Sequence, residues 1–153
     1  MPKEVRNMAA SVRARLLNLA RERNRPFDLL LIRYVAERLL YRLASTKHRE
    51  RFVLKGAMLT TTWFNDPHRP TRDLDLLGFG DPDPEGVLGI FRQICVLDAY
   101  DGGTFGVAGL TVDRIRDEAK KPPKLVRHNG YYELGRERRH RTACGFESLV
   151  LDQ

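Results

Sequence analysis

The segment Thr71–Leu77 constrains the fold of this chain more than any other. In it, Asp73 and Asp75 alternate with Leu74 and Leu76. Successive side chains of a β-strand point to opposite faces, so the alternation predicts a half-buried strand with an apolar face and a carboxylate face. Such a strand needs neighbouring strands for its backbone and an apolar layer against its leucines. The chain therefore has to build at least a small sheet.

Apolar residues at helical spacing predict helices on both sides of this strand. Pro26 separates an amphipathic helix from a strongly apolar one that Asp28 is expected to cap. A third helix follows the step Lys55-Gly56, and Pro84 opens a fourth. The predicted helices cover residues 8–23, 28–46, 57–63 and 84–97.

The periodic spacing of apolar residues becomes weaker beyond the fourth predicted helix. Short strands are predicted at residues 104–107, 110–115, 131–134 and 149–151, and residues 136–141 are a run of charges. A length of 153 residues suits one domain and excludes a multidomain enzyme. The expected organisation is a single globular unit with basic helices over 1–50, a core over 51–120, and a divergent basic tail over 121–153 that can join the sheet.

Charge is unevenly distributed along the chain, whose net charge is +7. Residues 1–51 carry 13 basic and five acidic side chains, whereas residues 52–112 carry four and eight. A basic N-terminal segment beside an acidic middle favours a polyanionic partner such as nucleic acid, together with a site that prefers cations. Solvated helix faces would give the same counts, and this alternative stays open.

Other sequence features indicate the cellular compartment of the protein. The cysteines Cys95 and Cys144 are too few and too distant for a disulfide framework, and the chain lacks a zinc-ligand spacing. Charged residues occupy the N-terminus where a signal peptide would be apolar, and Leu29–Ile32 is too short to span a membrane. We therefore expect a soluble cytoplasmic protein with no membrane partner.

Asp73 and Asp75 are the first candidates for chemistry. On a strand their Cα atoms would lie roughly 6–7 Å apart on one face. Two carboxylates so placed suit Mg²⁺, which takes oxygen ligands from one or two carboxylates and from substrate phosphates. An edge strand with a charged solvent face would have the same pattern.

Cationic and glycine residues flank the carboxylates in the sequence. Lys55-Gly56-Ala57 lies where a short strand gives way to a helix, so its backbone N–H groups can face a triphosphate. Arg69 and Arg72 add positive charge suited to phosphate oxygens. An ordinary helix N-terminus and a surface turn would give the same residues, and that reading stays open.

Taken together, residues 52–59 (FVLKGAML) and 69–76 (RPTRDLDL) resemble the AbiEii/AbiGii toxin family, nucleotidyltransferases of the DNA polymerase β superfamily. The resemblance covers about residues 10 to 118. It implies an α/β (α+β) nucleotidyltransferase-like fold: a small mixed sheet flanked by helices and preceded by an N-terminal helical pair. It also implies transfer of NMP from an NTP to RNA, reported for some members as the tRNA 3′ end, by a toxin paired with a separately encoded antitoxin.

The resemblance also implies roles for individual residues. Gly56 and Ala57 match the step that lies against the phosphates, Arg69 and Thr71 match the polar positions before the acidic strand, and Asp73 and Asp75 match the ligands of Mg²⁺ or Mn²⁺. With Lys55 and Arg72 added from their charge, the expected nucleotide-binding set is Lys55, Gly56, Ala57, Arg69, Thr71 and Arg72.

The chain departs from the family pattern in its last third. Relatives have a third carboxylate on a later strand and a further helical half that bears a lysine; here Asp152 and Glu133 are the available acids. The chain looks truncated or divergent after about residue 120. The alternatives to an active enzyme are a catalytically incomplete fragment and a non-catalytic protein that binds nucleic acid or an antitoxin.

Overall fold

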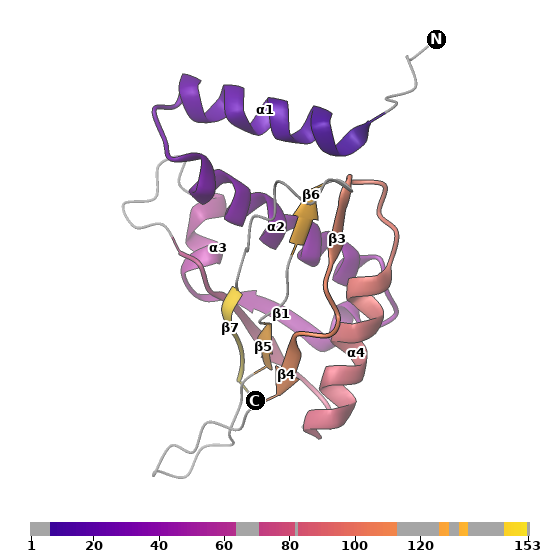
Figure 1. The fold of residues 1–153 in the computed structure, drawn as a ribbon. Coiled ribbons are helices and arrows are strands. Elements are labelled where there is room, and N and C mark those ends of the chain that lie inside the picture. Colours follow the sequence, from indigo (N-terminus) through magenta and orange to yellow (C-terminus); the bar gives the residue numbers. More distant parts are fainter. Residues whose placement is uncertain are drawn as a thin grey trace.

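The main sheet carries the predicted acidic strand in its interior, and Figure 1 shows the helices and strands of the fold. The computed structural model describes residues 7–63, 71–81, 83–112, 126–128, 132–134 and 146–152. The main sheet has the order β1 (Phe52–Lys55), β2 (Leu74–Gly78), β7 (Phe146–Asp152), β5 (Val126–His128), β4 (Leu110–Val112). A separate pair joins β3 (Gly103–Phe105) to β6 (Tyr132–Leu134).

β2 has a neighbour on each side. It pairs antiparallel with β1, with Lys55 opposite Asp75, and parallel with β7, with Leu77 opposite Asp152. The remaining pairings, β5 with β7 and β4 with β5, are antiparallel, so the sheet is mixed as expected. Because β2 is an interior strand, the reading of the acidic pattern as an edge strand is wrong. The run 149–151 lies within β7.

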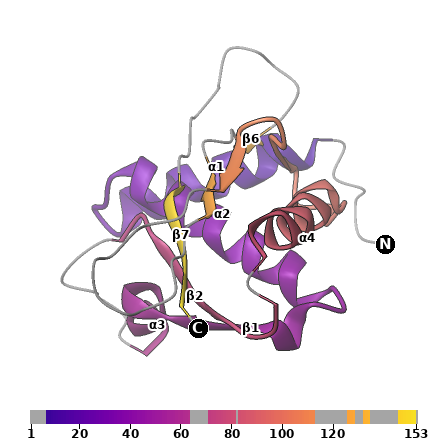
Figure 2. The same ribbon diagram turned by 90° about the horizontal axis from the view of Figure 1, so that it is seen from below.

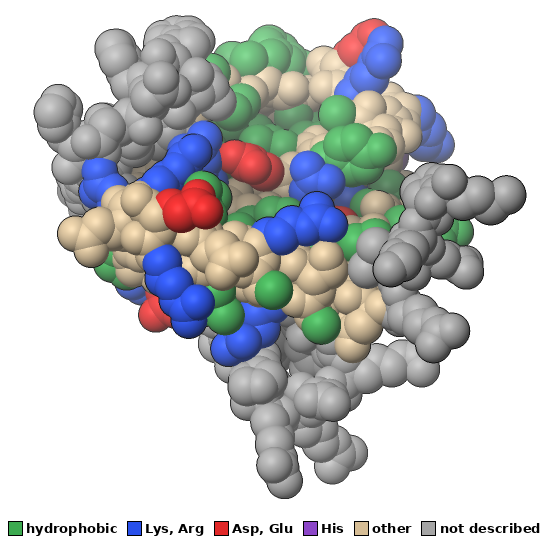
Figure 3. All heavy atoms as spheres, turned by 90° about the horizontal axis from the view of Figure 1, so that it is seen from above, with side chains coloured by type: hydrophobic (Ala, Val, Ile, Leu, Met, Phe, Trp, Pro, Cys, Tyr) green, Lys and Arg blue, Asp and Glu red, His purple; other side chains and the backbone are tan. Residues whose placement is uncertain are grey.

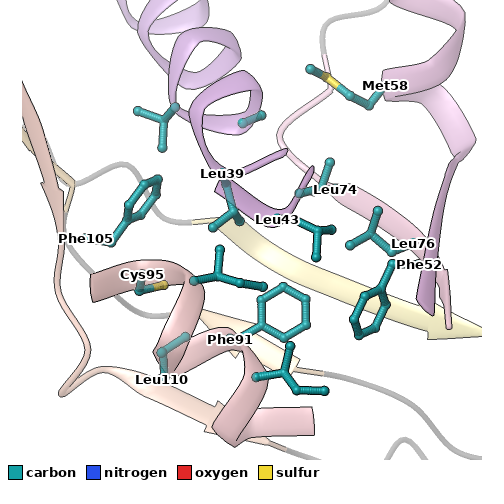
Figure 4. Packing of buried hydrophobic residues seen from close by; sticks show 14 of the residues in the cluster. Leu39, Leu43, Phe52, Met58, Leu74, Leu76, Phe91, Cys95, Phe105 and Leu110 are labelled. Carbon is teal, nitrogen blue, oxygen red and sulfur yellow. The ribbon is translucent and has the colours of Figure 1, made fainter. Parts of the chain in front are cut away.

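The inner face of β2 forms the centre of the hydrophobic core. Leu74 and Leu76 are each 1% exposed. Figure 4 shows them beside Leu39 and Leu43 of α2 (Phe27–Ala44), with Phe91 of α4 (Pro84–Val96) in the same cluster. Burying each leucine side chain contributes about 1.5–3 kcal/mol, which fixes which face of β2 points inward. The alternation in the sequence predicted this correctly.

The N-terminal helices pack on each other. α1 (Met8–Glu22) lies across α2 on the side away from the main sheet (Figure 1). Its buried residues recur at helical spacing: Ala9, Val12, Leu16 and Ala20. The Oδ1 atom of Asn7 accepts the N–H of Ala10 at 3.0 Å and caps the helix.

Asp28 does not cap α2. Pro26 takes the cap position and makes no side-chain hydrogen bond there, while Asp28 lies in the first turn. The proline ring fixes an extended entry to the helix, and an acid in the first turn still favours the positive end of the helix dipole. The helix itself, Phe27–Ala44, agrees with the predicted one to within two residues.

The predicted strand at 71–77 is shorter in the structure. The Oγ1 atom of Thr71 accepts the N–H of Asp73 at 3.2 Å, which makes a local turn and delays the strand until Leu74. The helix Gly56–Trp63 (α3) and α4 agree with expectation, and the weak strands at 104–107 and 110–115 become β3 and β4. Residue Tyr131, residues 113–115 and the charge run 136–141 lie outside the described residues.

A buried ion pair ties α2 to the segment between α4 and β3. The side chains of Arg42 and Asp101 are 2% and 3% exposed, and one guanidinium nitrogen of Arg42 lies 3.0 and 3.2 Å from the two carboxylate oxygens. Arg42 also donates to the carbonyl oxygens of Cys95 and Gly103. Its guanidinium lies 4.7 Å from the centre of the Phe105 ring. This network holds residues 95–105 against the helix.

Within the described part of the chain, every helix is too short or too polar to cross a lipid bilayer.

Candidate active site

The step from β1 to α3 brings the backbone into an unusual conformation. β1 ends at Lys55 and α3 begins at the next residue, Gly56, whose φ is +71°. Residues that carry a side chain rarely adopt this left-handed backbone region, whereas glycine does so without steric penalty. Figure 2 shows the step at the α3 end of β1, opposite the end at which α4 lies.

Gly56 is also required by the close approach of Asp75. A Cβ atom at position 56 would lie 2.1 Å from Oδ2 of Asp75 and 2.9 Å from its Cγ. Such contacts are far inside van der Waals separation, so the carboxylate fills the space that a larger residue would need. The sequence predicted close approach at Gly56 by a phosphate; the structure puts a carboxylate of the same protein there.

Lys55 faces the same carboxylate. Lys55 and Asp75 are directly opposite in the antiparallel register, so their side chains share one face of the sheet. Burial raises the pKa of the half-buried Asp75 above its usual 3.8, the positive charge of Lys55 lowers it, and the nearby Asp73 raises it further. Since burial dominates, a cation beside Asp75 would stabilise its charged form.

Asp73 lies immediately before β2 and is exposed. Its backbone is held by Thr71, whose Oγ1 accepts the Asp73 N–H at 3.2 Å and donates to the Asp73 carbonyl at 3.3 Å. Thr71 therefore shapes the turn that presents Asp73. Arg72 is exposed between them, Ala57 is exposed at the start of α3, and Arg69 lies outside the described residues. Lys55, Gly56 and Asp75 are the predicted residues that meet directly.

The two candidate third acids lie on different sheets. Glu133 is on β6, opposite Thr104 of β3, away from the strand that bears Asp75. Asp152 is on β7, opposite Leu77, two positions along the parallel register from the pair Asp75–Val150. Among the described residues, no group of three or more His, Cys, Asp or Glu side chains is arranged to hold a metal ion.

An apolar strip on the same face was missed in the sequence. Val53 is opposite Leu77, and Phe79 continues the alternation of Asp73, Asp75 and Leu77. Val53 and Phe79 are 50% and 51% exposed. The period of two that identified the acidic strand extends to Phe79 and was the available signal. The strip gives an apolar surface beside the carboxylate, of the kind that a nucleobase or sugar packs against.

The arrangement brings together groups that can bind a metal ion and a phosphate. Asp73, just before β2, and Asp75, near its start, contribute carboxylate oxygens, the ligands that Mg²⁺ prefers. A lysine stands opposite the inner carboxylate, and a helix begins at the glycine that touches it. The helix N-terminus offers backbone N–H groups to an anion.

Comparison with known proteins places the chain in a family. The family model described as nucleotidyl transferase AbiEii toxin, type IV toxin–antitoxin system, matches residues 38–135. The match contains β1, α3, β2 and α4, and it extends past residue 120, after which the chain was expected to diverge from the family. No curated protein matches the chain.

Proposed function

Because the chain belongs to the AbiEii nucleotidyl transferase toxin family of type IV toxin–antitoxin systems, we propose that it transfers NMP from an NTP to RNA, with the tRNA 3′ end as the acceptor. The single observation that carries this proposal is the position of Asp75. Its carboxylate lies against Gly56, where α3 begins, and opposite Lys55. An acid, a cation and a helix N-terminus thus meet at one point.

Asp73 and Asp75 are the proposed holders of Mg²⁺ or Mn²⁺. Both contribute carboxylate oxygens, and burial has raised the pKa of Asp75, so a bound cation would relieve an existing electrostatic penalty. When bound, the metal ion supplies neutralisation of phosphate charge. Thr71 keeps Asp73 in place by holding its backbone.

The triphosphate would lie along the β1–α3 step. Lys55 supplies a cation, and the backbone of Gly56 and Ala57 supplies N–H donors at the start of α3. Arg69, Thr71 and Arg72 complete the proposed nucleotide-binding set ahead of the carboxylates. In-line attack by a ribose hydroxyl then depends mainly on positioning and charge neutralisation, which these residues provide.

The basic N-terminal helix is the proposed support for the RNA. Figure 3 views the face on which α1 lies, and Lys and Arg side chains are spread across it. On α1 and just after it Arg15, Arg21 and Arg23 are exposed. Phosphate contacts from such residues supply affinity without sequence specificity. A separately encoded antitoxin is the second proposed partner, as expected for this toxin family.

The direct test is transfer of label from each radiolabelled NTP to total tRNA in the presence of Mg²⁺. The test variant is Asp73→Ala/Asp75→Ala, and the matched control is Glu50→Ala/Glu85→Ala, which removes two exposed acids elsewhere. We expect the wild type and the control to label RNA and the test variant to lose labelling. Equal labelling by all three proteins would overturn the site assignment.

A second measurement separates metal binding from chemistry. Anything that binds the folded state alone raises the unfolding temperature. We expect Mg²⁺ with a non-hydrolysable NTP analogue to raise the unfolding temperature of the wild type and of Glu50→Ala/Glu85→Ala. The same addition should leave Asp73→Ala/Asp75→Ala unchanged. A rise of equal size in the test variant would contradict metal binding at these aspartates.

The basic helical face favours a second candidate function, non-catalytic binding of RNA or of the antitoxin. In that case affinity would fall steeply with salt, because binding releases counterions from the polyanion. It would not depend on Mg²⁺ or on Asp73 and Asp75. Salt-dependent RNA binding by a folded protein that transfers no label would favour this function.

A further inference from the structure

A pocket of about 280 Å³ lies between α1, α2 and the segment that joins α4 to β3. Its apolar floor includes Val12 and Leu16, which are buried in α1. Met8 and Tyr100 stand at its edge, 37% and 82% exposed. The start of α1 and the top of β3 lie on the side of the molecule away from α3 in both ribbon views, so the pocket is separate from the β1–α3 step (Figures 1 and 2).

Two arginines make the pocket positive. Arg15 and Arg38 both line it. The guanidinium of Arg38 lies 5.6 Å from the ring centre of Tyr34 and 5.0 Å from that of Tyr41, which holds it in place. Its buried Nε atom has no hydrogen-bond partner. Because Nε is covered, an acceptor that enters the pocket would contact the terminal nitrogens of this guanidinium, where a charge-assisted hydrogen bond to an anion is favourable.

The acid in the pocket lining does not cancel this charge. Asp101 contributes to the lining, but its carboxylate is bound to Arg42 and also accepts the N–H of Gly103. Among the described residues, no carboxylate forms an ion pair with Arg15 or Arg38. One terminal nitrogen of Arg15 donates to Oγ of Ser11 at 3.1 Å. The other donors of Arg15 and the terminal nitrogens of Arg38 can bind an anion, which suits a phosphate.

Tyr100 adds an aromatic surface in a strained conformation. Its φ is +51°, a region that non-glycine residues seldom occupy, and its N–H donates to Oδ1 of Asp98 at 2.9 Å. Strain of this kind persists only where the surroundings impose it, and it is concentrated at ligand sites. An exposed tyrosine ring beside two arginines is a surface on which a base can stack.

The segment that carries Tyr100 is firmly anchored. The next residue, Asp101, is fixed by Arg42, and its carbonyl accepts the hydroxyl of Tyr34 at 3.0 Å. Gly102 has φ +78° and packs so closely on α1 that a Cβ would lie 2.6 Å from the backbone nitrogen of Ala9. The ring is therefore presented by a rigid turn, which reduces the entropy lost on binding.

We propose that this pocket binds one nucleotide unit of an RNA strand, with the phosphate at Arg15 and Arg38 and the base stacked on Tyr100. Its volume is just below the range of about 300–1,000 Å³ typical of drug-sized ligands, which fits a single nucleotide. The inference rests on the proposed function for the choice of RNA as the source. It gives the acceptor a holding point apart from the carboxylates.

The test is fluorescence anisotropy with a short labelled single-stranded RNA and the full chain. Tyr100→Gly removes the ring and also relieves the positive φ, so it should raise the unfolding temperature while weakening RNA binding. A base stack is worth between about 5-fold and 150-fold in affinity. If Tyr100 had a purely structural role, RNA affinity would not fall while the unfolding temperature rises. Unchanged affinity in Tyr100→Gly would overturn the proposal.

The phosphate contact is tested by Arg38→Gln, with Arg92→Gln on the exposed side of α4 as the control. Loss of one phosphate contact should reduce the slope of log affinity against log salt by about one in Arg38→Gln. The control should keep the wild-type slope. Identical slopes in both variants would overturn the assignment of Arg38.

Free AMP identifies the source of the nucleotide. We expect RNA to bind tightly and AMP to compete with the labelled RNA only weakly. If AMP binds and RNA does not, and AMP binding is lost in Tyr100→Gly and Arg38→Gln, the choice of RNA is overturned. The pocket and the proposed function fail separately. If Asp73→Ala/Asp75→Ala keeps its RNA affinity but loses label transfer, the pocket and the proposed function both stand. If the wild type binds RNA through Tyr100 but transfers no label, only the proposed function is contradicted.

Discussion

The carboxylate of Asp75 occupies the space in which any residue other than glycine at position 56 would carry its Cβ, with 2.1 Å between Oδ2 and the ideal Cβ position. The two residues come from different elements, β2 and the start of α3. Their contact fixes how closely the helix approaches the acidic strand. Positions 56 and 75 are therefore coupled, and a change at one acts on the other.

Gly56→Ala should reduce both stability and activity. The new methyl group would displace the Asp75 carboxylate, and the φ of +71° is unfavourable for alanine. Backbone strain of this kind destabilises by about 1–3 kcal/mol. Urea unfolding measures the loss of stability, and label transfer to RNA measures the displacement of Asp75.

Gly89→Ala is the matched control for that substitution. Gly89 lies inside α4, and nothing lies within 4 Å of its ideal Cβ position. Alanine there should stabilise the helix by about 0.5–1 kcal/mol. If Gly56→Ala were as stable as Gly89→Ala, the close approach of Asp75 would not constrain position 56.

Asp75→Asn should stabilise the protein at neutral pH. Burial raises the pKa of Asp75 above 3.8 in the folded state, so the folded state holds this proton more tightly than the unfolded state does. The resulting stabilisation is complete below pH 3.8 and is lost as the pH rises through the raised pKa. The neutral asparagine avoids that loss.

The measurement is the urea midpoint of the wild type and Asp75→Asn at neutral pH and at pH about 4, without metal ions. The variant's advantage should be largest at neutral pH and should shrink on acidification. An advantage that is constant with pH would mean that ionisation of Asp75 is not its cause. The same variant should lose label transfer at every pH.

Asp152→Asn and Glu133→Gln should differ in their effect on transfer. Asp152 lies on the strand beside β2, whereas Glu133 lies on the separate β3–β6 pair. If Asp152 supports the metal site, Asp152→Asn should lower transfer by about 10- to 100-fold, as losses around metal centres typically do. Glu133→Gln should transfer label as the wild type does. Equal losses in the two variants would remove Asp152 from the site.

The sequence predicted the parts of the site that depend on local patterns. Period-two alternation identified β2 and its inward leucines, and the helical periods identified α1, α2 and α4. The contact of Gly56 with Asp75 was not predictable, because it depends on how α3 meets a strand that follows it in the chain.

The pairing of β2 with β7 shows the same limit more strongly. The apolar run at 149–151 is short, and nothing local to it identifies Leu74 as the partner of Leu149. Strand pairing over such a separation is set by the whole core rather than by either segment. The pocket beside Tyr100 was likewise invisible in the sequence, because it needs α1, α2 and a distant turn to meet.

Arg42→Met should destabilise the fold by about 3–5 kcal/mol. Removing the guanidinium leaves the carboxylate of Asp101 buried at 3% exposure without its cation. The double variant Arg42→Met/Asp101→Asn removes the uncompensated charge and should recover part of that loss. Urea unfolding of Arg42→Met, Asp101→Asn and the double variant measures the coupling energy between the two side chains. Additive effects would mean that the two side chains do not act as a pair.

The parallel pairing of β2 with β7 also means that the main sheet cannot be completed until residues 146–152 have been synthesised. The ribosome makes the acidic strand early, but the strand that lies beside it comes from residues 146–152. Until those residues appear, one whole edge of β2 has no partner, and contacts between distant segments form slowly. If the toxin is active only as the finished sheet, a nascent chain on the ribosome would be harmless to the cell that makes it. At that stage the unpaired edge of β2 would be open to pairing with a strand of another chain.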